Sequence, residues 1–206
     1  MKLNLPTKIT LVRLFLIPVF MAVFFIEAIP YRYAVAAAIF VLAAATDALD
    51  GHIARSRNLV TTLGKNLDPI ADKVLISTAM ILLLVMKDSV CAPFGSVENL
   101  LYASLAVCVC IIMARELIIS AFRQIAASNG VIMAADKLGK LKTIFQDIAI
   151  FGILFFAGIA SLFETWMIWH TYLLAFALVI FGIATILTIW SGIAYVVNNK
   201  QVLKDA

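Results

Sequence analysis

The chain has 206 residues, of which 64% are hydrophobic and only 14% are charged. A water-soluble domain of this length cannot bury so much apolar surface, so the composition excludes a soluble globular protein and indicates an integral membrane protein. The formal net charge of +4 is small, and no nucleic-acid partner is expected.

Apolar stretches long enough to span a membrane follow one another along the chain, after a mixed segment over residues 1–8 that predicts a short amphipathic helix on the membrane surface. The expected spans cover residues 9–29, 33–55, 68–86, 98–123, 143–163 and 166–197. Turns over residues 27–32 and 87–97 and polar connections over residues 56–65 and 126–142 separate them. The sequence therefore predicts an all-α integral membrane protein with six transmembrane helices in a single domain over residues 1–206.

Lysine and arginine are distributed unevenly between the two sides of this expected bundle. All but two of the sixteen fall on the side that holds both termini and the connections after the second and fourth spans, the exceptions being Arg32 and Lys87. Positively charged loops stay in the cytoplasm, so both termini and the stretch between Asp47 and Asp72 are predicted on the cytoplasmic side of the membrane.

Polar and ionisable residues within the spans gather in the cytoplasmic third of the expected helices. They are Arg13, Asp47, Asp50, Asp68, Asp72, Lys73, Arg115, Glu116, Gln146 and Asp147. Because such groups are costly in a bilayer, they are expected to face a shared polar cavity that opens to the cytosol and the inner leaflet. A cation carrier is the alternative from another functional class, but it would need polar residues across the full depth of a helix.

The densest group of chemically active residues is the acidic stretch from Asp47 to Asp72. Asp47 and Asp50 are three residues apart and Asp68 and Asp72 are four apart, so each pair lies on one face of a helix. Two converging acidic pairs repel strongly unless a counter-charge lies between them. One or two divalent cations are the simplest neutraliser, and oxygen ligands favour Mg²⁺, Mn²⁺ or Ca²⁺ over Zn²⁺.

A structural role is the alternative for these aspartates, which could reach the membrane surface from helix ends or pair with Arg55 and Lys73. Four carboxylates at this spacing favour metal binding. The small residues among them, Gly51, Ala54 and Gly64, let a ligand or a neighbouring helix approach closely.

The spacing of the stretch resembles a known family signature. Asp47-x2-Asp50-Gly51-x2-Ala54-Arg55-x8-Gly64-x3-Asp68-x3-Asp72 matches the signature of the CDP-alcohol phosphatidyltransferase family at every fixed position. The resemblance implies that family's fold and its reaction, in which an alcohol displaces CMP from a CDP-linked lipid. It also implies two divalent ions, Mg²⁺ or Mn²⁺, held by Asp47, Asp50, Asp68 and Asp72 against the diphosphate, with Asp72 accepting the proton of the attacking hydroxyl. Charge neutralisation by metal ions is what phosphoryl transfer needs.

The N-terminal segment from Leu5 to Arg13 resembles the family's entry segment, which helps to hold the cytidine. This resemblance and the signature give the candidate contacts to CDP-diacylglycerol: Pro6, Thr7, Thr10, Gly51, Ala54, Arg55, Thr61 and Gly64. The alternative for Pro6 and Thr7 is an ordinary helix start. Arg13, the last residue of this segment, could extend to the lipid headgroups and have no part in the nucleotide site.

Two later segments resemble the family members that use sn-glycerol 3-phosphate as the acceptor alcohol. They are Arg115–Arg123 in the fourth span and Gly139–Gln146 at the start of the fifth. Arg115, Arg123, Lys140 and Lys142 would form a basic cluster that suits a doubly negative acceptor phosphate. For the two lysines, anchoring at the membrane surface is the alternative.

The reaction that this resemblance implies is transfer of the phosphatidyl group from CDP-diacylglycerol to glycerol 3-phosphate, giving phosphatidylglycerophosphate and CMP. Sibling reactions with phosphatidylglycerol, inositol phosphate or serine as acceptor are the alternatives within the family. The relatives are homodimers, so the resemblance also implies a homodimer surrounded by lipids in a bacterial cytoplasmic membrane.

Overall fold

The computed structural model describes residues 4–56, 62–128, 137–160 and 167–198. Within these ranges it describes the backbone alone for residues 5–6, 47–56, 62–66, 128, 137–138 and 167–168.

Every regular element in these ranges is helical. The helices are α1 (Leu5–Phe25), α2 (Arg32–Ser56), α3 (Thr62–Val85), α4 (Lys87–Cys91), the 3₁₀ helix η1 (Ala92–Val97), α5 (Glu98–Ser128), α6 (Lys137–Ile159) and α7 (Met167–Asn198). The all-α prediction is therefore confirmed for the described part of the chain.

Four helices in the described ranges are long and apolar enough to cross a membrane. These candidate spans are Thr7–Phe25 in α1, Gly139–Ile159 in α6, Trp169–Asn198 in α7 and the segment Lys87–Ala127, which comprises α4, η1 and most of α5. Arg32–Thr46 in α2 forms a shorter apolar helix. Their large side chains are exposed around the bundle, as in Phe15 (70% exposed) and Leu100 (73%). Such a surface is stable only in an apolar surrounding, which supports insertion of the bundle in a lipid bilayer.

The helix boundaries differ from the predicted spans mainly where the sequence is polar. α1 begins at Leu5, so residues 5–8 belong to the first long helix and do not form a separate surface helix. α3 begins at Thr62 and α6 at Lys137, several residues before the expected spans. Hydropathy marks where an apolar run starts, whereas backbone hydrogen bonding continues through the polar turns that precede it. The expected turn over residues 87–97 is built from α4 and η1.

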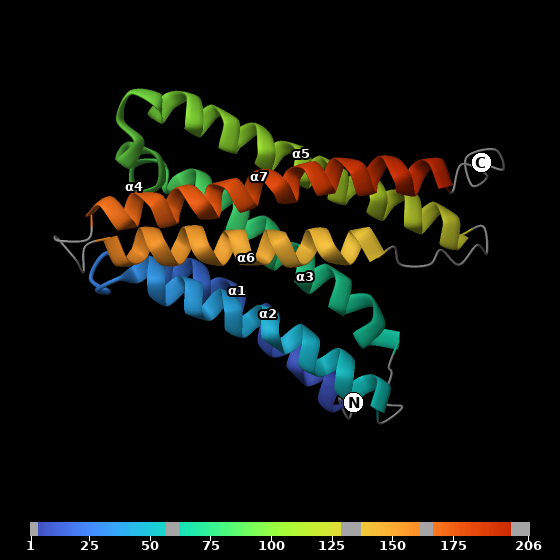
Figure 1. Ribbon diagram of the computed structural model, residues 1–206. Helices are drawn as coiled ribbons and strands as arrows, with labels where there is room; N and C mark the ends of the chain where they lie inside the picture. The colour runs from blue at the N-terminus through green and yellow to red at the C-terminus, as the bar shows by residue number, and fades with distance from the viewer. Residues whose placement is uncertain (1–3, 57–61, 129–136, 161–166, 199–206) are drawn as a thin grey trace.

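The long helices lie roughly along one direction, and their ends define two ends of the bundle (Figure 1). α1 packs against α2 and α3, α2 against α6, α6 against α7, and α7 against α5. The start of α1 and the end of α7 lie at the same end, which we call the polar end (Figure 1). α4 and the turn between α1 and α2 lie at the opposite end (Figure 1).

The inward face of α1 shows how the sequence separates these two ends. Residues at helical spacing are buried along its whole length, namely Thr7, Thr10, Arg13, Ile17, Phe20 and Phe24. The first three are polar and lie at the polar end, and the last three join the main apolar core. Apolar packing therefore holds the helices together away from the polar end. At the polar end the buried polar groups require hydrogen-bond partners, so a polar site can form there.

Replacement of Gly158 by alanine is expected to destabilise the bundle at the α2–α6 contact. A Cβ atom at Gly158 would lie 2.2 Å from the backbone nitrogen of Ala34, and backbone cannot move aside as a flexible side chain can. Overpacking of this kind costs about 1–3 kcal/mol. A melting temperature in detergent several degrees below that of the wild type is the expected measurement.

The matched control is Gly182→Ala in α7, where a Cβ atom would meet nothing within 4 Å. It gains the same helix propensity without the close contact, so its melting temperature should equal or exceed the wild-type value. Equal melting temperatures for the two variants would contradict the close helix approach.

Candidate functional site

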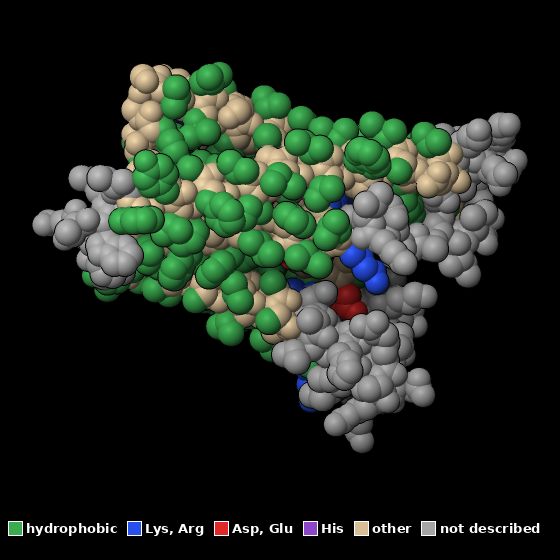
Figure 2. Space-filling model, in the orientation of Figure 1, with side chains coloured by type: hydrophobic (Ala, Val, Ile, Leu, Met, Phe, Trp, Pro, Cys, Tyr) green, Lys and Arg blue, Asp and Glu red, His purple; other side chains and the backbone are tan. Residues whose placement is uncertain are grey.

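A polar pocket of about 650 Å³ opens between α3, α5, α6 and the last turns of α7. Its polar and charged lining residues are Asp72, Lys73, Ser77, Arg115, Glu116, Ser120, Arg123, Gln124, Lys140, Lys142, Thr143, Gln146 and Tyr195. Figure 2 shows charged side chains gathered toward the polar end of a surface that is otherwise mostly hydrophobic. The pocket is therefore a recess lined by charged and polar residues in a bundle whose surface is otherwise mostly apolar.

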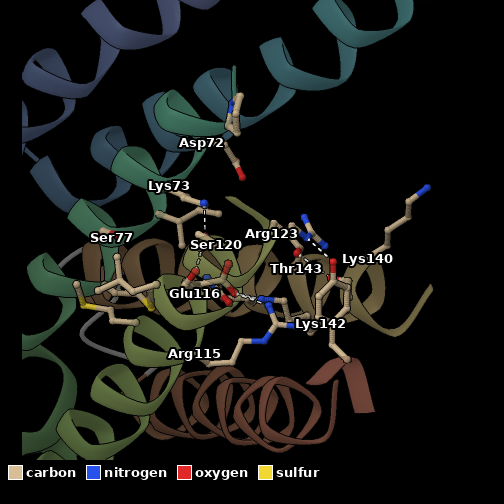
Figure 3. A pocket seen from close by; sticks show the side chains of 18 of the residues that line it. Asp72, Lys73, Ser77, Arg115, Glu116, Ser120, Arg123, Lys140, Lys142 and Thr143 are labelled. Carbon is tan, nitrogen blue, oxygen red and sulfur yellow. Dashed lines mark hydrogen bonds and ion pairs between the residues drawn. The ribbon is translucent and has the colours of Figure 1, made fainter. Parts of the chain in front are cut away.

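The structure brings together five of the predicted site residues in this pocket: Asp72, Arg115, Arg123, Lys140 and Lys142. Asp72 comes from α3, the two arginines from α5 and the two lysines from the first turns of α6 (Figure 3). The side chain of Lys140 extends away from the other labelled groups (Figure 3). Three cations thus face the pocket together with the Asp72 carboxylate, and Lys140 lies at its rim.

Glu116 holds two of these cations in place. Its Oε1 accepts a hydrogen bond from Nη1 of Arg115 at 3.2 Å and forms an ion pair with Nζ of Lys142. Lys142 is 4% exposed, and it also lies in the field of the Asp72 charge. A buried lysine needs such a counter-charge, so Glu116 fixes Lys142 and Arg115 on the same side of the pocket.

The last turns of α7 contribute residues that the sequence interpretation missed. Nη2 of Arg115 donates to Oγ of Ser191 at 3.1 Å. Nε of Arg123 donates to Oη of Tyr195 at 3.0 Å, and its guanidinium carbon lies 5.1 Å from the centroid of that ring. The available signal was a serine and a tyrosine four residues apart, near the end of a helix that carries no charged residue. Both arginines of α5 are therefore held by α7.

Lys73 is a further cation at the pocket that was not among the predicted acceptor residues. Its Nζ donates to Oγ of Ser120, and the Ser120 hydroxyl donates to the backbone oxygen of Glu116. The position of Lys73 directly after Asp72 was a signal for this role. The hydrogen bond from Lys73 to Ser120 links α3 to α5 next to Asp72.

The acidic signature lies partly within the described side chains. Asp68 and Asp72 are both partly buried on α3, one helical turn apart on one face. Asp47 and Asp50 lie on α2, which packs against α3, but their side chains lie outside the described residues. Among the described residues no group of three or more His, Cys, Asp or Glu side chains is close enough to hold a metal. The donors that are described, two carboxylates, fit a hard divalent cation.

The predicted nucleotide-binding residues divide in the same way. Thr7 and Thr10 are buried in α1, and the Thr10 hydroxyl donates to Oδ1 of Asp68 at 2.6 Å. The other predicted contacts lie where the structure describes the backbone alone, at Pro6, Gly51, Ala54, Arg55 and Gly64, or outside the described residues, at Thr61. Arg13 does not extend to the lipid headgroups, because it is 0% exposed and its Nε donates to Oγ1 of Thr46 on α2.

Comparison with known proteins places the chain among phospholipid-synthesising enzymes. The profile of the CDP-alcohol phosphatidyltransferase family matches residues 3–197. A CDP-diacylglycerol–glycerol-3-phosphate 3-phosphatidyltransferase of Bacillus subtilis (strain 168) is 34% identical over 98% of both chains. Proteins with the same name from Salmonella typhimurium and Escherichia coli K12 are 35% and 34% identical over 100% of both chains. With its apolar helices and this full-length match, the chain is a multi-pass membrane protein and belongs to the CDP-alcohol phosphatidyltransferase family.

Proposed function

We propose that this enzyme transfers the phosphatidyl group from CDP-diacylglycerol to sn-glycerol 3-phosphate, giving phosphatidylglycerophosphate and CMP. The similar full-length chains that are named for this activity support the proposal. The observation that carries it is the pocket in which Asp72 faces Arg115, Arg123 and Lys142. An acceptor such as serine, which lacks a phosphate, gives no reason for three cations at this place.

The cations would bind the acceptor and orient it. A glycerol 3-phosphate dianion fits beside Arg115 and Lys142, because guanidinium and ammonium groups donate several charge-assisted hydrogen bonds to phosphate oxygens. Glu116 keeps these two groups together before the acceptor arrives, so less ordering is needed upon binding. The opposite end of glycerol 3-phosphate, which carries the free hydroxyls, is then directed toward α3.

Asp72 would accept the proton of the attacking hydroxyl. The hydroxyl oxygen forms a bond to the phosphorus that carries the diacylglycerol, and the bond from that phosphorus to the CMP oxygen breaks. Asp72 lines the same pocket as the three cations, which suits a base that must reach the acceptor. Asp47, Asp50, Asp68 and Asp72 would hold the divalent ions, Mg²⁺ or Mn²⁺, whose positive charge would neutralise the diphosphate.

The membrane arrangement follows from the same proposal. Six spans formed by α1, α2, α3, α5, α6 and α7 would place the polar end at the cytoplasmic face, in agreement with the lysine and arginine bias. Cytidine and glycerol 3-phosphate would enter from the cytosol and the acyl chains from the inner leaflet. A homodimer in the bacterial cytoplasmic membrane remains our expectation, by analogy with the family.

Purified protein in detergent with CDP-diacylglycerol and a panel of acceptors tests the proposal. Radiolabelled glycerol 3-phosphate should be incorporated into lipid with equimolar release of CMP, and a chelator should stop both until Mg²⁺ or Mn²⁺ is restored. Phosphatidylglycerol, inositol phosphate and serine should give only background. Faster turnover with one of these three acceptors would replace the proposal with a sibling reaction. Metal-dependent ion flux into sealed vesicles without CMP release would favour a cation carrier.

A further inference from the structure

The contact between Thr10 and Asp68 joins two helices that carry different parts of the predicted site. Thr10 lies on α1 and is 1% exposed. Its hydroxyl donates to Oδ1 of Asp68 on α3 at 2.6 Å, between residues 58 positions apart in the chain. This length is typical of a charge-assisted hydrogen bond from a hydroxyl to a carboxylate. The bond is therefore a strong, partly buried link between α1 and α3.

A hydrogen bond of this kind fixes the orientation of the carboxylate. The terminal torsion of aspartate is broad, so a carboxylate without a fixed donor samples many orientations. With Oδ1 held by Thr10, the plane of the Asp68 carboxylate is set by the packing of α1 on α3. Groups that orient ligating carboxylates in this way tune metal affinity.

Arg13 supports the same face of α1 one turn further along. It is 0% exposed, and its Nε donates to Oγ1 of Thr46, which itself donates to the backbone oxygen of Ala43. Thr46 directly precedes Asp47 in α2. The polar face of α1 thus contacts the acid-bearing part of α2 through Arg13 and that of α3 through Thr10.

We infer that Thr10 is a positioning residue, which orients Asp68 for a divalent cation, and that it is not primarily a contact for the nucleotide. The inference rests on the proposed function, in which Asp68 is a metal ligand. A threonine hydroxyl has one hydrogen to donate, and in this structure that hydrogen goes to Asp68. Thr10 therefore has no donor left for a cytidine or phosphate oxygen.

The test compares Thr10 variants with and without a hydroxyl donor. In Thr10→Val the methyl group replaces the hydroxyl at nearly the same volume, whereas Thr10→Ser keeps the donor. Mn²⁺ binding to the detergent-solubilised protein, followed by electron paramagnetic resonance, should weaken about 10- to 100-fold in Thr10→Val, the usual effect of removing such an outer hydrogen bond. Thr10→Ser should stay close to the wild-type affinity. The Mn²⁺ concentration for half-maximal turnover should shift in the same way, with little change in the KM for CDP-diacylglycerol.

Thr185→Val is the matched control. Thr185 is also buried, but its hydroxyl donates within α7 to the backbone oxygen of Phe181 at 2.9 Å. This variant should bind Mn²⁺ like the wild type. If Thr10→Val does not fold, Thr10→Ala removes the same donor without the added methyl group and takes its place in the comparison.

Two results would overturn the inference. One is wild-type Mn²⁺ affinity in the folded donorless variant, and the other is a raised KM for CDP-diacylglycerol with unchanged Mn²⁺ affinity, which would make Thr10 a nucleotide contact. Either result leaves the proposed function intact if the wild type still converts glycerol 3-phosphate. Loss of the proposed function would appear separately, as wild-type protein that does not incorporate this acceptor.

Discussion

Asp72→Asn is expected to lower CMP release by about 100- to 10,000-fold, the usual contribution of a general base. Asparagine keeps the shape of the side chain but has no negative charge, so it neither accepts the hydroxyl proton nor neutralises a divalent cation. Asp72 is partly buried and lines the pocket beside Arg123 and Lys142. The initial rate of CMP release with both substrates saturating is the measurement.

Asp88→Asn is the control for this substitution. Asp88 is exposed in α4 at the opposite end of the bundle, so the same chemical change there should leave the rate unaltered. The melting temperature of Asp72→Asn must stay near the wild-type value for the result to report on chemistry. Normal turnover in a folded Asp72→Asn protein would remove Asp72 as the base.

Lys142→Ala is expected to raise the KM for glycerol 3-phosphate strongly and the KM for CDP-diacylglycerol only slightly. The pair affected is that of Lys142 with the acceptor phosphate. Truncating one partner of a buried, hydrogen-bonded charge pair across a binding interface costs about 2–5 kcal/mol in binding, equivalent to roughly 30- to 5,000-fold. Glu116 contacts both Arg115 and Lys142, and without Lys142 its carboxylate keeps the contact with Arg115 alone of these two. The Glu116 charge, then compensated only by Arg115, would repel the acceptor phosphate. Steady-state kinetics with each substrate varied in turn is the measurement.

A second substitution separates the two causes of this loss. Adding Glu116→Gln to Lys142→Ala removes the repelling carboxylate, so the double variant should recover part of the affinity for glycerol 3-phosphate. Lys8→Ala, which removes an exposed lysine of α1, is the control for loss of surface charge. Equal losses for both substrates in Lys142→Ala would contradict a role at the acceptor phosphate.

Local sequence patterns were sufficient for the family, the all-helical class and the candidate residues of the site. The spacing of Asp68 and Asp72 places both on one face of a helix whatever surrounds it. The position of Arg115 within an apolar run predicts a polar cavity, because a charged side chain that faces lipid is costly. These inferences hold because helix periodicity and the cost of burying charge act over a few residues.

The start of α3 shows where local patterns were insufficient. Hydropathy placed the span near Asp68, but the helix begins at Thr62. An apolar run indicates which residues lie in the hydrocarbon core of the bilayer. Helical hydrogen bonding can continue beyond that core, so the two boundaries differ. The sequence also predicted Thr10 as a contact to CDP-diacylglycerol and allowed Arg13 to extend to the lipid headgroups, whereas the structure pairs Thr10 with Asp68 and Arg13 with Thr46.

What the sequence determined by itself is thus a membrane bundle of helices with an acidic signature and a set of cations at one end. Only the tertiary structure decided which groups meet: Thr10 with Asp68, Arg115 with Ser191, and Arg123 with Tyr195. These pairs are 58 to 76 positions apart in the chain. Such contacts depend on which helix faces pack together. Because that choice is made by the whole bundle at once, no single segment carries the information.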